Sequence, residues 1–354
     1  MDVSVIICAY NRLWSLPKAI ESCRRSKCKV EIIVIDDAST DGTWEWLQQQ
    51  PDLVTLRQVS NWGKPWAVNR AFQIAKGKYI RFLDSDDWLY PDANDKQFEI
   101  AEKTQADLVV GGYEIYNERE ELIRSQNWVD CDDFIAQQLG EGDSSHYSAF
   151  LFKRELIENI PHRTSFASAG FASRDDRCLM LEVALAKPKI AVVYEPTLCR
   201  RHHSKKRLLF ATSLKGLGTD LQHILIYKNI INQLLIRGEL TPRRINAACE
   251  ILWIIAHSIA RTHLDEACEI ANWVYQLKPD FQPIEEGLLG KLYCHLGFRN
   301  TEVILRIRRT IVSLLRPQKT QKYLDFPCPK TAKISFPSDG FNVRINNYDS
   351  CEKI

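Results

Sequence analysis

Three short apolar segments, each running directly into a polar cluster, constrain the fold of this chain most strongly. They are residues 3–8, 30–35 and 79–83, and they lead into AYNR, DDASTDG and DSDD respectively. Segments with helical periodicity alternate with them, which is typical of a parallel sheet covered by helices on both faces. Ligands bind at the carboxyl ends of the strands in such a sheet. We therefore expect the three polar clusters to meet in one place.

The DSDD cluster gathers the carboxylates of Asp84, Asp86 and Asp87 where an apolar strand ends. Buried like charges are costly unless a cation compensates them, and hard oxygen ligands favour Mg²⁺ or Mn²⁺. The first hypothesis is therefore a metal site at a strand end. The alternative is an ordinary acidic turn leading into a helix, because Asp and Ser favour such connections.

Two residues in the other polar clusters offer what a nucleobase needs. Tyr10 has a ring face for stacking, and the Asp37 carboxylate can accept the imide N–H of uracil. Thymine carries the same imide, so Asp37 does not distinguish the two bases. The alternative is that Tyr10 packs against its neighbours and Asp37 caps a helix.

Four motifs together resemble the family 2 glycosyltransferases of the GT-A fold. They are CAYNR at 8–12, IDDASTDGT at 35–43, Asn69-Arg70, and FLDSDDW at 82–88, in the order and spacing of that family. The resemblance covers roughly residues 1 to 205. It implies an α/β protein with a GT-A type doubly wound, mainly parallel sheet. It also implies inverting transfer from a nucleotide sugar, in which one direct displacement needs no enzyme nucleophile.

The resemblance also implies roles for individual residues of the donor site. Asp86 is expected to bind Mn²⁺ or Mg²⁺ directly, with Asp84 on the ribose or in the metal shell. Family members often have an arginine at the position of Val68, and Arg70 or Lys64 can take its place. The expected nucleotide-sugar-binding residues are Ala9, Tyr10, Asn11, Arg12, Asp37, Asn69, Arg70, Asp84, Ser85, Asp86 and Arg200.

An acidic pair that opens a helix is the expected catalytic element. Inverting members use the second acid of such a pair as general base, so RDDR at 174–177 implies Asp176 as the base with Asp175 beside it. The alternative is an ordinary interaction of two acids with the helix dipole. Arg200 and His202 match an Arg-x-His element, which implies a phosphate contact and a further metal ligand. A solvated basic turn is the alternative there.

Length and composition set the expected domains. The chain has 354 residues, of which 45% are hydrophobic, and its net charge of +2 gives no pull toward nucleic acid. Its eleven cysteines have neither zinc-site nor disulfide-framework spacing. We expect a GT-A domain at 1–205, divided into a nucleotide-sugar half at 1–112 and an acceptor half at 113–205. A helical region at 206–316 and a loosely structured tail at 317–354 follow.

The expected location is cytoplasmic. The first strand begins at residue 3, which leaves no room for a signal peptide, and the longest apolar run, 251–256, is too short to span a bilayer. Within 299–316 five arginines accompany one acid, Glu302, and an apolar stripe contains Ile304, Ile307, Ile311 and Leu314. Such a helix either packs on its neighbours or makes a peripheral contact with the inner membrane face.

The preferred function is metal-dependent, inverting transfer of a sugar from a UDP- or dTDP-sugar to a hydroxyl of a glycan or lipid-linked acceptor. A non-catalytic nucleotide-sugar-binding or scaffold protein is the alternative. Nucleotidyl transfer is disfavoured, because the chain has no glycine-rich triphosphate motif.

Overall fold

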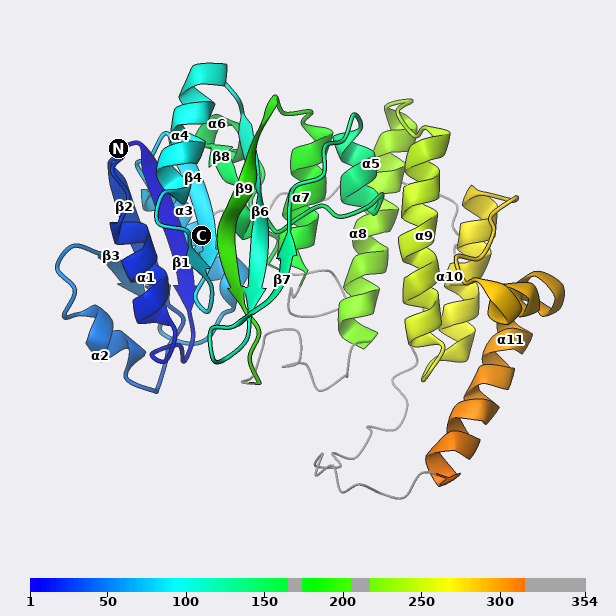
Figure 1. Ribbon diagram of the computed structural model, residues 1–354. Helices are drawn as coiled ribbons and strands as arrows, with labels where there is room; N and C mark the ends of the chain where they lie inside the picture. Colours follow the sequence, from blue (N-terminus) through cyan, green and yellow to red (C-terminus); the bar gives the residue numbers. More distant parts are fainter. Residues whose placement is uncertain (165–173, 205–216, 316–354) are drawn as a thin grey trace. The chain divides into compact units, whose positions relative to one another are not determined.

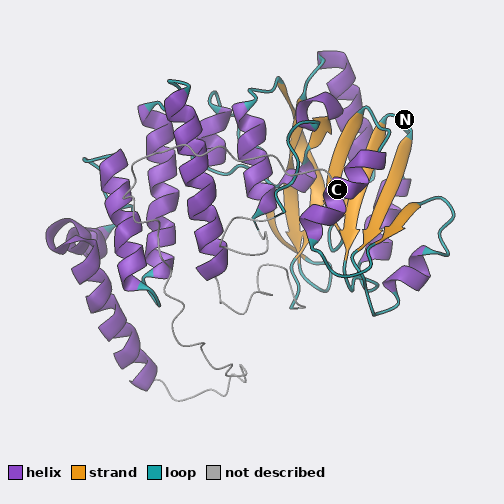
Figure 2. Ribbon diagram, turned by 180° about the vertical axis from the view of Figure 1, so that it is seen from behind, coloured by secondary structure: helices purple, strands orange, loops and turns teal. Residues whose placement is uncertain are grey.

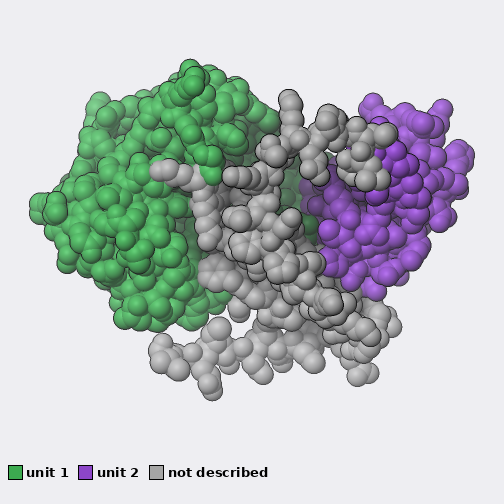
Figure 3. Space-filling view, turned by 90° about the horizontal axis from the view of Figure 1, so that it is seen from below, with its two compact units in different colours: residues 1–231, 241–248 green, residues 232–240, 249–354 purple. Residues whose placement is uncertain are grey.

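The computed structural model describes residues 1–164, 174–204 and 217–315, and the chain forms two compact units (Figures 1 and 3). Unit 1 comprises residues 1–231 and 241–248, and unit 2 comprises residues 232–240 and 249–354. The tail predicted at 317–354 lies outside the described residues, as does the Gly/Ser/Ala-rich stretch at 165–173. The boundaries predicted at 205 and 316 remain predictions.

Within its described residues, unit 1 is built on a mixed sheet in the order β3-β2-β1-β4-β8-β6-β9-β5, with β7 paired to β6. The strands are β1 (Val3–Ala9), β2 (Val30–Asp36), β3 (Val54–Arg57), β4 (Tyr79–Asp84), β5 (Trp88–Leu89), β6 (Leu108–Tyr116), β7 (Leu122–Gln126), β8 (Leu151–Lys153) and β9 (Ile190–Arg201).

The first four strands of the sheet are parallel, as predicted. β1 pairs with β2 and β4, and β2 pairs with β3, all in parallel. The rest of the sheet is more mixed than predicted, because β5, β7 and β8 each pair in antiparallel fashion. β7 follows β6 after a short turn, which reverses the direction of the chain and can only give an antiparallel pair.

Helices cover both faces of the sheet (Figures 1 and 2). Alternate side chains of β4 identify the two faces, since neighbours along a strand point in opposite directions. Arg81 binds Asn94 of α4, whereas Phe82 contacts the ring of His162 on the opposite face. The helices of this region are α1 (Leu16–Arg24), α2 (Thr43–Leu47), α3 (Lys64–Ile74), α4 (Ala93–Thr104), α5 (Phe134–Leu139), the 3₁₀ turn η1 (Tyr147–Ala149), α6 (Arg154–Ile157) and α7 (Asp175–Leu185).

Arg81 is a fully buried cation in the core of the sheet. Its guanidinium donates to Asn94 at 2.7 Å, to Gln97, and to the carbonyl of Ser148 at 3.1 Å. Burial lowers the pKa of Arg81 to about 10. A buried charge must be hydrogen-bonded to be tolerated, and these bonds tie η1 to β4 and α4.

Long helices without strands follow, as predicted. They are α8 (Leu217–Ile236), α9 (Pro242–Ile259), α10 (Leu264–Leu277) and α11 (Gly287–Leu315). Trp253 is fully buried in unit 2 and contacts the rings of Phe281, Tyr293 and Phe298. The last of these comprises two helical stretches that meet in a kink at Gly297, whose φ of 74° is left-handed. No helix among the described residues has the length and apolarity needed to cross a bilayer.

Candidate active site

The carboxyl ends of β1, β2 and β4 lie level at one edge of the sheet. The pairing register places Cys8 beside both Ile35 and Asp84, and Ala9 beside Asp36. The three polar clusters therefore meet, as the strand pattern predicted. Asp84 ends β4, while Ser85, Asp86 and Asp87 form the turn before β5.

Asp84 is held by cationic and polar groups that come from distant parts of the chain. Lys64, the first residue of α3, contacts its Oδ1 at 2.5 Å, and the Tyr147 hydroxyl donates to the same oxygen at 3.1 Å. Burial by itself raises the pKa of Asp84, but Lys64 and His146 outweigh it and lower the pKa below the usual value. Asp84 is therefore ionised at neutral pH.

Asp86 contacts a histidine other than the one that was expected. His203 Nε2 lies 2.8 Å from Asp86 Oδ2, and its side chain is almost fully buried. The His202 side chain is exposed, and its role as a metal ligand remains a prediction. Successive side chains point in opposite directions in extended chain, and only one of the two can face the acids. Burial tends to raise the pKa of Asp86, but the His203 hydrogen bond gives a net lowering.

Asp87 is buried behind the other two acids. It accepts a hydrogen bond from the backbone N–H of Arg201 at 2.9 Å. Burial raises the pKa of Asp87, and the charges of Asp86 and Asp84 raise it further. A bound cation would reverse this effect, since it favours the ionised carboxylate.

His146 completes a group with Asp84 and Asp87 in which one ligand atom from each lies within 4.8 Å of the others. Burial, together with Arg200, lowers the pKa of His146 to about 3, so its ring is neutral at pH 7. The N–H of Ser148 donates to Nδ1 at 3.3 Å, which leaves the ring proton on Nε2, 3.9 Å from Asp84. In this tautomer Nδ1 is already an acceptor and Nε2 carries a proton, so the ring has no free lone pair for a cation.

The site fits a divalent metal ion. Its acids are carboxylates at a strand end, and His203 Nδ1 is a buried ring nitrogen with no hydrogen-bond partner among the described residues. Carboxylate oxygens, with or without an imidazole, suit Mg²⁺ and Mn²⁺. Asp86, Asp84 and His203 are the residues that would hold such an ion, with Asp87 behind them.

The expected base-binding residues gather at the ends of β1 and β2. Ala9 is buried, and Tyr10 exposes 43% of its surface, so its ring face is accessible. Asn11 has a left-handed φ of 54°, and its side chain accepts from Thr40 N–H at 2.8 Å. Asp37 is buried and accepts hydrogen bonds from the Gln58 side chain and from the N–H groups of Trp62 and Gly63.

The cations expected around the diphosphate are only partly assembled at the acids. The charge of Arg200 tends to lower the pKa of both Asp84 and Asp87, and the charge of Arg12 tends to lower the pKa of Asp86. Arg70 is instead exposed and donates to the carbonyl of Arg57 at 3.4 Å. Lys64 is thus the cation of α3 that contacts the acidic cluster.

Asn69 is engaged with the backbone and does not reach the acids. Its side chain donates to the carbonyl of His162 at 2.8 Å and accepts from the N–H of the same residue at 2.9 Å. Through this pair of hydrogen bonds Asn69 ties α3 to the segment around His162.

Asp175 and Asp176 open α7, as the RDDR motif predicted, but their environments differ. Asp175 is buried and paired with His162 at 2.7 Å. Asp176 is partly accessible. The charge of Lys64 tends to lower its pKa, and the charge of Asp84 tends to raise it. Burial raises the pKa of Asp176, and the adjacent Asp175 raises it further. A carboxylate with a raised pKa is suited to accept a proton.

Four residues of this region escaped sequence reasoning: His146, Tyr147, His162 and His203. Each contacts one of the motif acids. None stands in a recognisable motif except His203, which is one residue from the expected histidine. Folding brings them to the acids from elsewhere in the chain.

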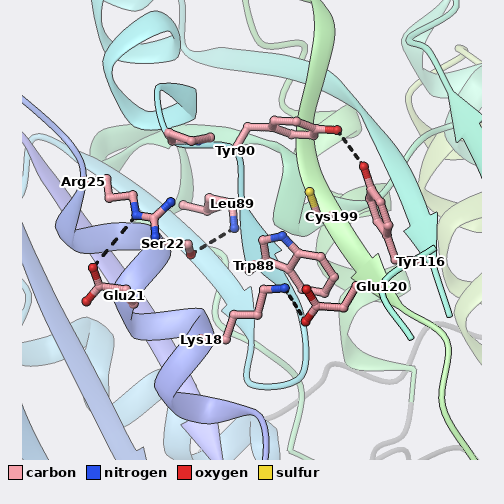
Figure 4. A pocket seen from close by; sticks show the side chains of 11 residues that line it. Lys18, Glu21, Ser22, Arg25, Trp88, Leu89, Tyr90, Tyr116, Glu120 and Cys199 are labelled. Carbon is pink, nitrogen blue, oxygen red and sulfur yellow. Dashed lines mark hydrogen bonds and ion pairs between the residues drawn. The ribbon is translucent and has the colours of Figure 1, made fainter. Parts of the chain in front are cut away.

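A separate depression of about 480 Å³ lies on the side of α1, β5 and the end of β9 (Figure 4). Its polar groups contact one another: Lys18 pairs with Glu120 at 2.6 Å, and the hydroxyls of Tyr90 and Tyr116 lie 3.1 Å apart. Lys18 also covers the Trp88 ring at 3.7 Å. These contacts leave the depression without a clear ligand preference.

Comparisons with known proteins agree with this fold. Residues 4–176 match the model of glycosyl transferase family 2. An Escherichia coli UDP-Glc:alpha-D-GlcNAc-diphosphoundecaprenol beta-1,3-glucosyltransferase, WfaP, is 43% identical over 89 residues, which are 24% of this chain and 36% of that protein. Glycosyltransferase GlyG of Streptococcus pneumoniae is 30% identical over 142 residues, which are 39% and 46% of the two chains.

A solved structure shares the fold. Residues 1–349 of Staphylococcus aureus TarS, in complex with UDP-GlcNAc, superpose with a TM-score of 0.51 at 15% identity, covering 79% of this chain and 91% of that one. This likeness shows the fold, and the family match covers the strands whose ends carry the acids. Residues 4–176 carry a glycosyl transferase family 2 domain, and the matches span less than half the length of the two curated relatives named above.

Proposed function

We propose that this protein is a metal-dependent, inverting glycosyltransferase that moves a sugar from a UDP- or dTDP-sugar to an acceptor hydroxyl. The observation that carries the proposal is the meeting of two sets of acids at one edge of the sheet. Asp84 and Asp86 form one set, and Asp176 belongs to the other. Lys64 interacts electrostatically with both Asp84 and Asp176.

The donor site follows from the ends of β1 and β2. Tyr10 presents its ring to the base, and the partly satisfied Asp37 carboxylate accepts the imide N–H. Asp37 already has three protein donors on its two oxygens, and a carboxylate offers about four acceptor positions. WfaP is named for a UDP-Glc donor and TarS was solved in complex with UDP-GlcNAc, which supports a uridine donor here.

The diphosphate site combines Asp84, Asp86 and His203 with an Mn²⁺ or Mg²⁺ ion, and Lys64 replaces the arginine that relatives often carry on this helix. When bound, the metal ion supplies positive charge that stabilises the leaving nucleotide diphosphate. Lys64 adds a fixed cation from the first turn of α3, and Arg200 adds another from β9. These groups face the charge that develops as the sugar departs.

The acceptor is activated by Asp176. Its raised pKa favours uptake of the hydroxyl proton while the acceptor oxygen attacks the anomeric carbon and the nucleotide diphosphate leaves. This single displacement inverts the anomeric configuration. Asp175 is occupied by His162 and takes no part in the transfer of the proton.

The acceptor class we propose is a glycan or a lipid-linked sugar. WfaP is named for a diphosphoundecaprenol-linked acceptor, and a Bacillus spizizenii relative, 33% identical over 119 residues, for poly(ribitol-phosphate). Release of nucleotide diphosphate from a panel of nucleotide sugars, with Mn²⁺ or Mg²⁺, tests the proposal. Release from a UDP- or dTDP-sugar is expected. A protein that binds UDP but releases nothing with any acceptor would instead be the non-catalytic binder.

One face of α11 favours a peripheral contact with the inner membrane face. Glu302 is fully buried, whereas Ile304, Ile307 and Ile311 on the opposite side of the helix are 42%, 56% and 51% exposed. An exposed apolar stripe on an amphipathic helix suits the interface of a bilayer. The side chain of Leu314 and all of Arg316, which belong to the predicted helix, lie outside the described side chains.

Three arginines of this helix already have partners within the protein, so binding to a membrane needs a direct test. Arg299 pairs with Asp265, Arg309 approaches Glu302, and Arg306 donates to the carbonyls of Arg261 and Thr262. We expect the full chain to sediment with anionic vesicles at low salt, and a variant with serine at 304, 307 and 311 to stay in solution. Ile254→Ser, at an exposed position of α9, is the control. Equal sedimentation of all three proteins, or none, contradicts the proposal.

A further inference from the structure

His162 and Asp175 form a buried pair beneath the proposed catalytic carboxylate. His162 Nδ1 lies 2.7 Å from Asp175 Oδ2, and each side chain exposes only 3% of its surface. Asp175 immediately precedes Asp176 in the first turn of α7. A carboxylate that is removed from water requires hydrogen bonds to remain ionised. Among the described residues, His162 supplies the hydrogen bond that the Asp175 side chain receives.

The surroundings of His162 keep it in one position. Asn69 of α3 binds both its N–H and its carbonyl, at 2.9 and 2.8 Å. The ring packs edge-on against Phe82 of β4, with the ring centres 4.8 Å apart. His162 thus connects α3 and the central strand of the site with the start of α7.

The hydrogen bond indicates which nitrogen of the His162 ring carries the proton. An ionised Asp175 can only accept, so Nδ1 carries the proton and donates. Nε2 is buried and has no hydrogen-bond partner among the described residues. A proton there would leave a buried N–H without a partner, which is costly. The arrangement therefore suits a neutral ring protonated on Nδ1.

The pair separates the roles of two adjacent acids. With Oδ2 of Asp175 bound to His162, the carboxylate of Asp175 is directed into the interior. The carboxylate of Asp176 remains on the accessible side, where its Oδ1 accepts from the N–H of Arg177 at 2.8 Å. Without the donor at Nδ1, the buried charge of Asp175 would have to find a new partner, and the first turn of α7 would move with it.

We propose that His162 is a positioning residue for the general base: through its hydrogen bond to Asp175 it fixes the first turn of α7 and so the direction in which Asp176 faces the acceptor. The inference rests on the proposed function, since it assigns catalysis to Asp176. His162 itself contacts neither donor nor acceptor.

Two substitutions separate the hydrogen bond from simple packing. His162→Asn places an amide N–H close to the position of Nδ1, whereas His162→Leu fills the space without a donor. Misplacement of a catalytic group by about 1 Å can cost roughly a hundredfold in rate. We expect kcat of His162→Leu to fall about ten- to a hundredfold with the KM of the donor unchanged, and His162→Asn to stay within about fivefold of the wild type.

Calorimetry of UDP binding and thermal melting accompany the kinetics, so that unfolding of a variant is recognised. Equal kcat values for the Leu and Asn variants, whether both impaired or both intact, would overturn the proposal. So would a loss that appears wholly in the KM of the donor.

A second measurement does not depend on activity, and it separates this inference from the proposed function. Nitrogen-15 NMR of the histidine rings should show a ring protonated on Nδ1 that is lost in His162→Leu and shifts in Asp175→Asn. A wild-type spectrum in which the His162 proton lies on Nε2 contradicts the pair, even if the protein transfers no sugar. If the pair is present but Asp176→Asn retains full turnover, the proposed base is wrong and His162 positions no catalytic group.

Discussion

At the scale of single residues, the proposed mechanism depends on two adjacent acids, Asp175 and Asp176, that have different partners. Asp175 is bound to His162 in the interior, while Asp176 is partly accessible and near Lys64. Asp176→Asn keeps the shape and removes the ability to accept a proton. Turnover should fall at least about a hundredfold while the affinity for UDP changes little. Steady-state kinetics and calorimetry measure the two quantities.

An Asp176→Asn variant with wild-type turnover would remove the general base from the mechanism. Asp175→Asn is the informative comparison, because it perturbs the neighbouring position. If only Asp175→Asn abolished turnover, the base would lie one residue earlier than we propose.

Lys64 and Arg70 both lie on α3 and test which cation serves the diphosphate. Lys64 contacts Asp84 at 2.5 Å, whereas Arg70 is exposed and binds a backbone carbonyl. Lys64→Met should weaken UDP binding about tenfold or more, because a charge-assisted contact of roughly 1.5–3 kcal/mol is removed. Arg70→Met should leave binding within about twofold. The opposite ranking in calorimetric titrations would restore Arg70 as the phosphate ligand.

The pH dependence of kcat should report Asp176. Burial and then Asp175 raise its pKa, and a general base acts only when deprotonated. The rate should therefore fall as the pH is lowered through this raised pKa, above the value of about 3.9 for an ordinary aspartate. Asp84 and Asp86 have lowered pKa values and stay ionised over this range.

Asp87 is the control for that pH profile, because its pKa is also raised, by burial and by its acidic neighbours. In Asp87→Asn the acidic limb should keep its position even if the maximal rate changes. A limb that disappears in this variant would assign the titration to Asp87.

At the scale of elements, a close contact between strand ends positions β4 beside β1. Gly77 N–H donates to Ser4 Oγ at 2.7 Å, and a Cβ at Gly77 would lie 2.4 Å from Ser4 N. Gly77→Ala should destabilise the fold by about 1–3 kcal/mol through overpacking, seen as a lower midpoint in thermal melting. Lys76→Ala, at the exposed neighbouring position, should change stability by less than about 0.5 kcal/mol. Similar midpoints for both variants would show that this contact relaxes at no cost.

Strands whose residues are buried in long runs could be predicted from the sequence, and exposed or very short strands could not. β1, β2 and β4 have long buried runs, so their apolar patterns were sufficient. β7 was missed, because its residues 122–125 are exposed and carry no apolar pattern. β5 has only two residues, and the direction of β8 depends on the path of the chain between helices. The first stretch of α11, before the kink at Gly297, was missed because Gly290 weakens its helical pattern.

The same limit applies to the site. Asp84, Asp86, Asp175 and Asp176 were predictable, because each lies in a local motif. Some of their partners come from remote segments without a recognisable motif: His146 and Tyr147 contact Asp84, and His162 contacts Asp175. Contacts of this kind depend on tertiary structure, so a single sequence offers no local signal for them.

At the scale of the whole molecule, unit 1 carries the family match and every residue of the proposed chemistry. The helices of unit 2 add the exposed face of α11, with Ile304, Ile307 and Ile311. The transfer chemistry does not depend on that face. We therefore expect vesicle binding and nucleotide release to respond to different substitutions.

Calorimetric titration of UDP, with and without Mn²⁺, tests the central claim most directly. The account predicts that Mn²⁺ strengthens UDP binding in the wild type and that Asp86→Ala abolishes this effect. His203→Ala should weaken the effect, and His202→Ala, at the exposed neighbouring position, should leave it unchanged. Equal affinity with and without Mn²⁺ in the wild type and in Asp86→Ala would contradict a metal-dependent nucleotide-sugar site at the end of β4.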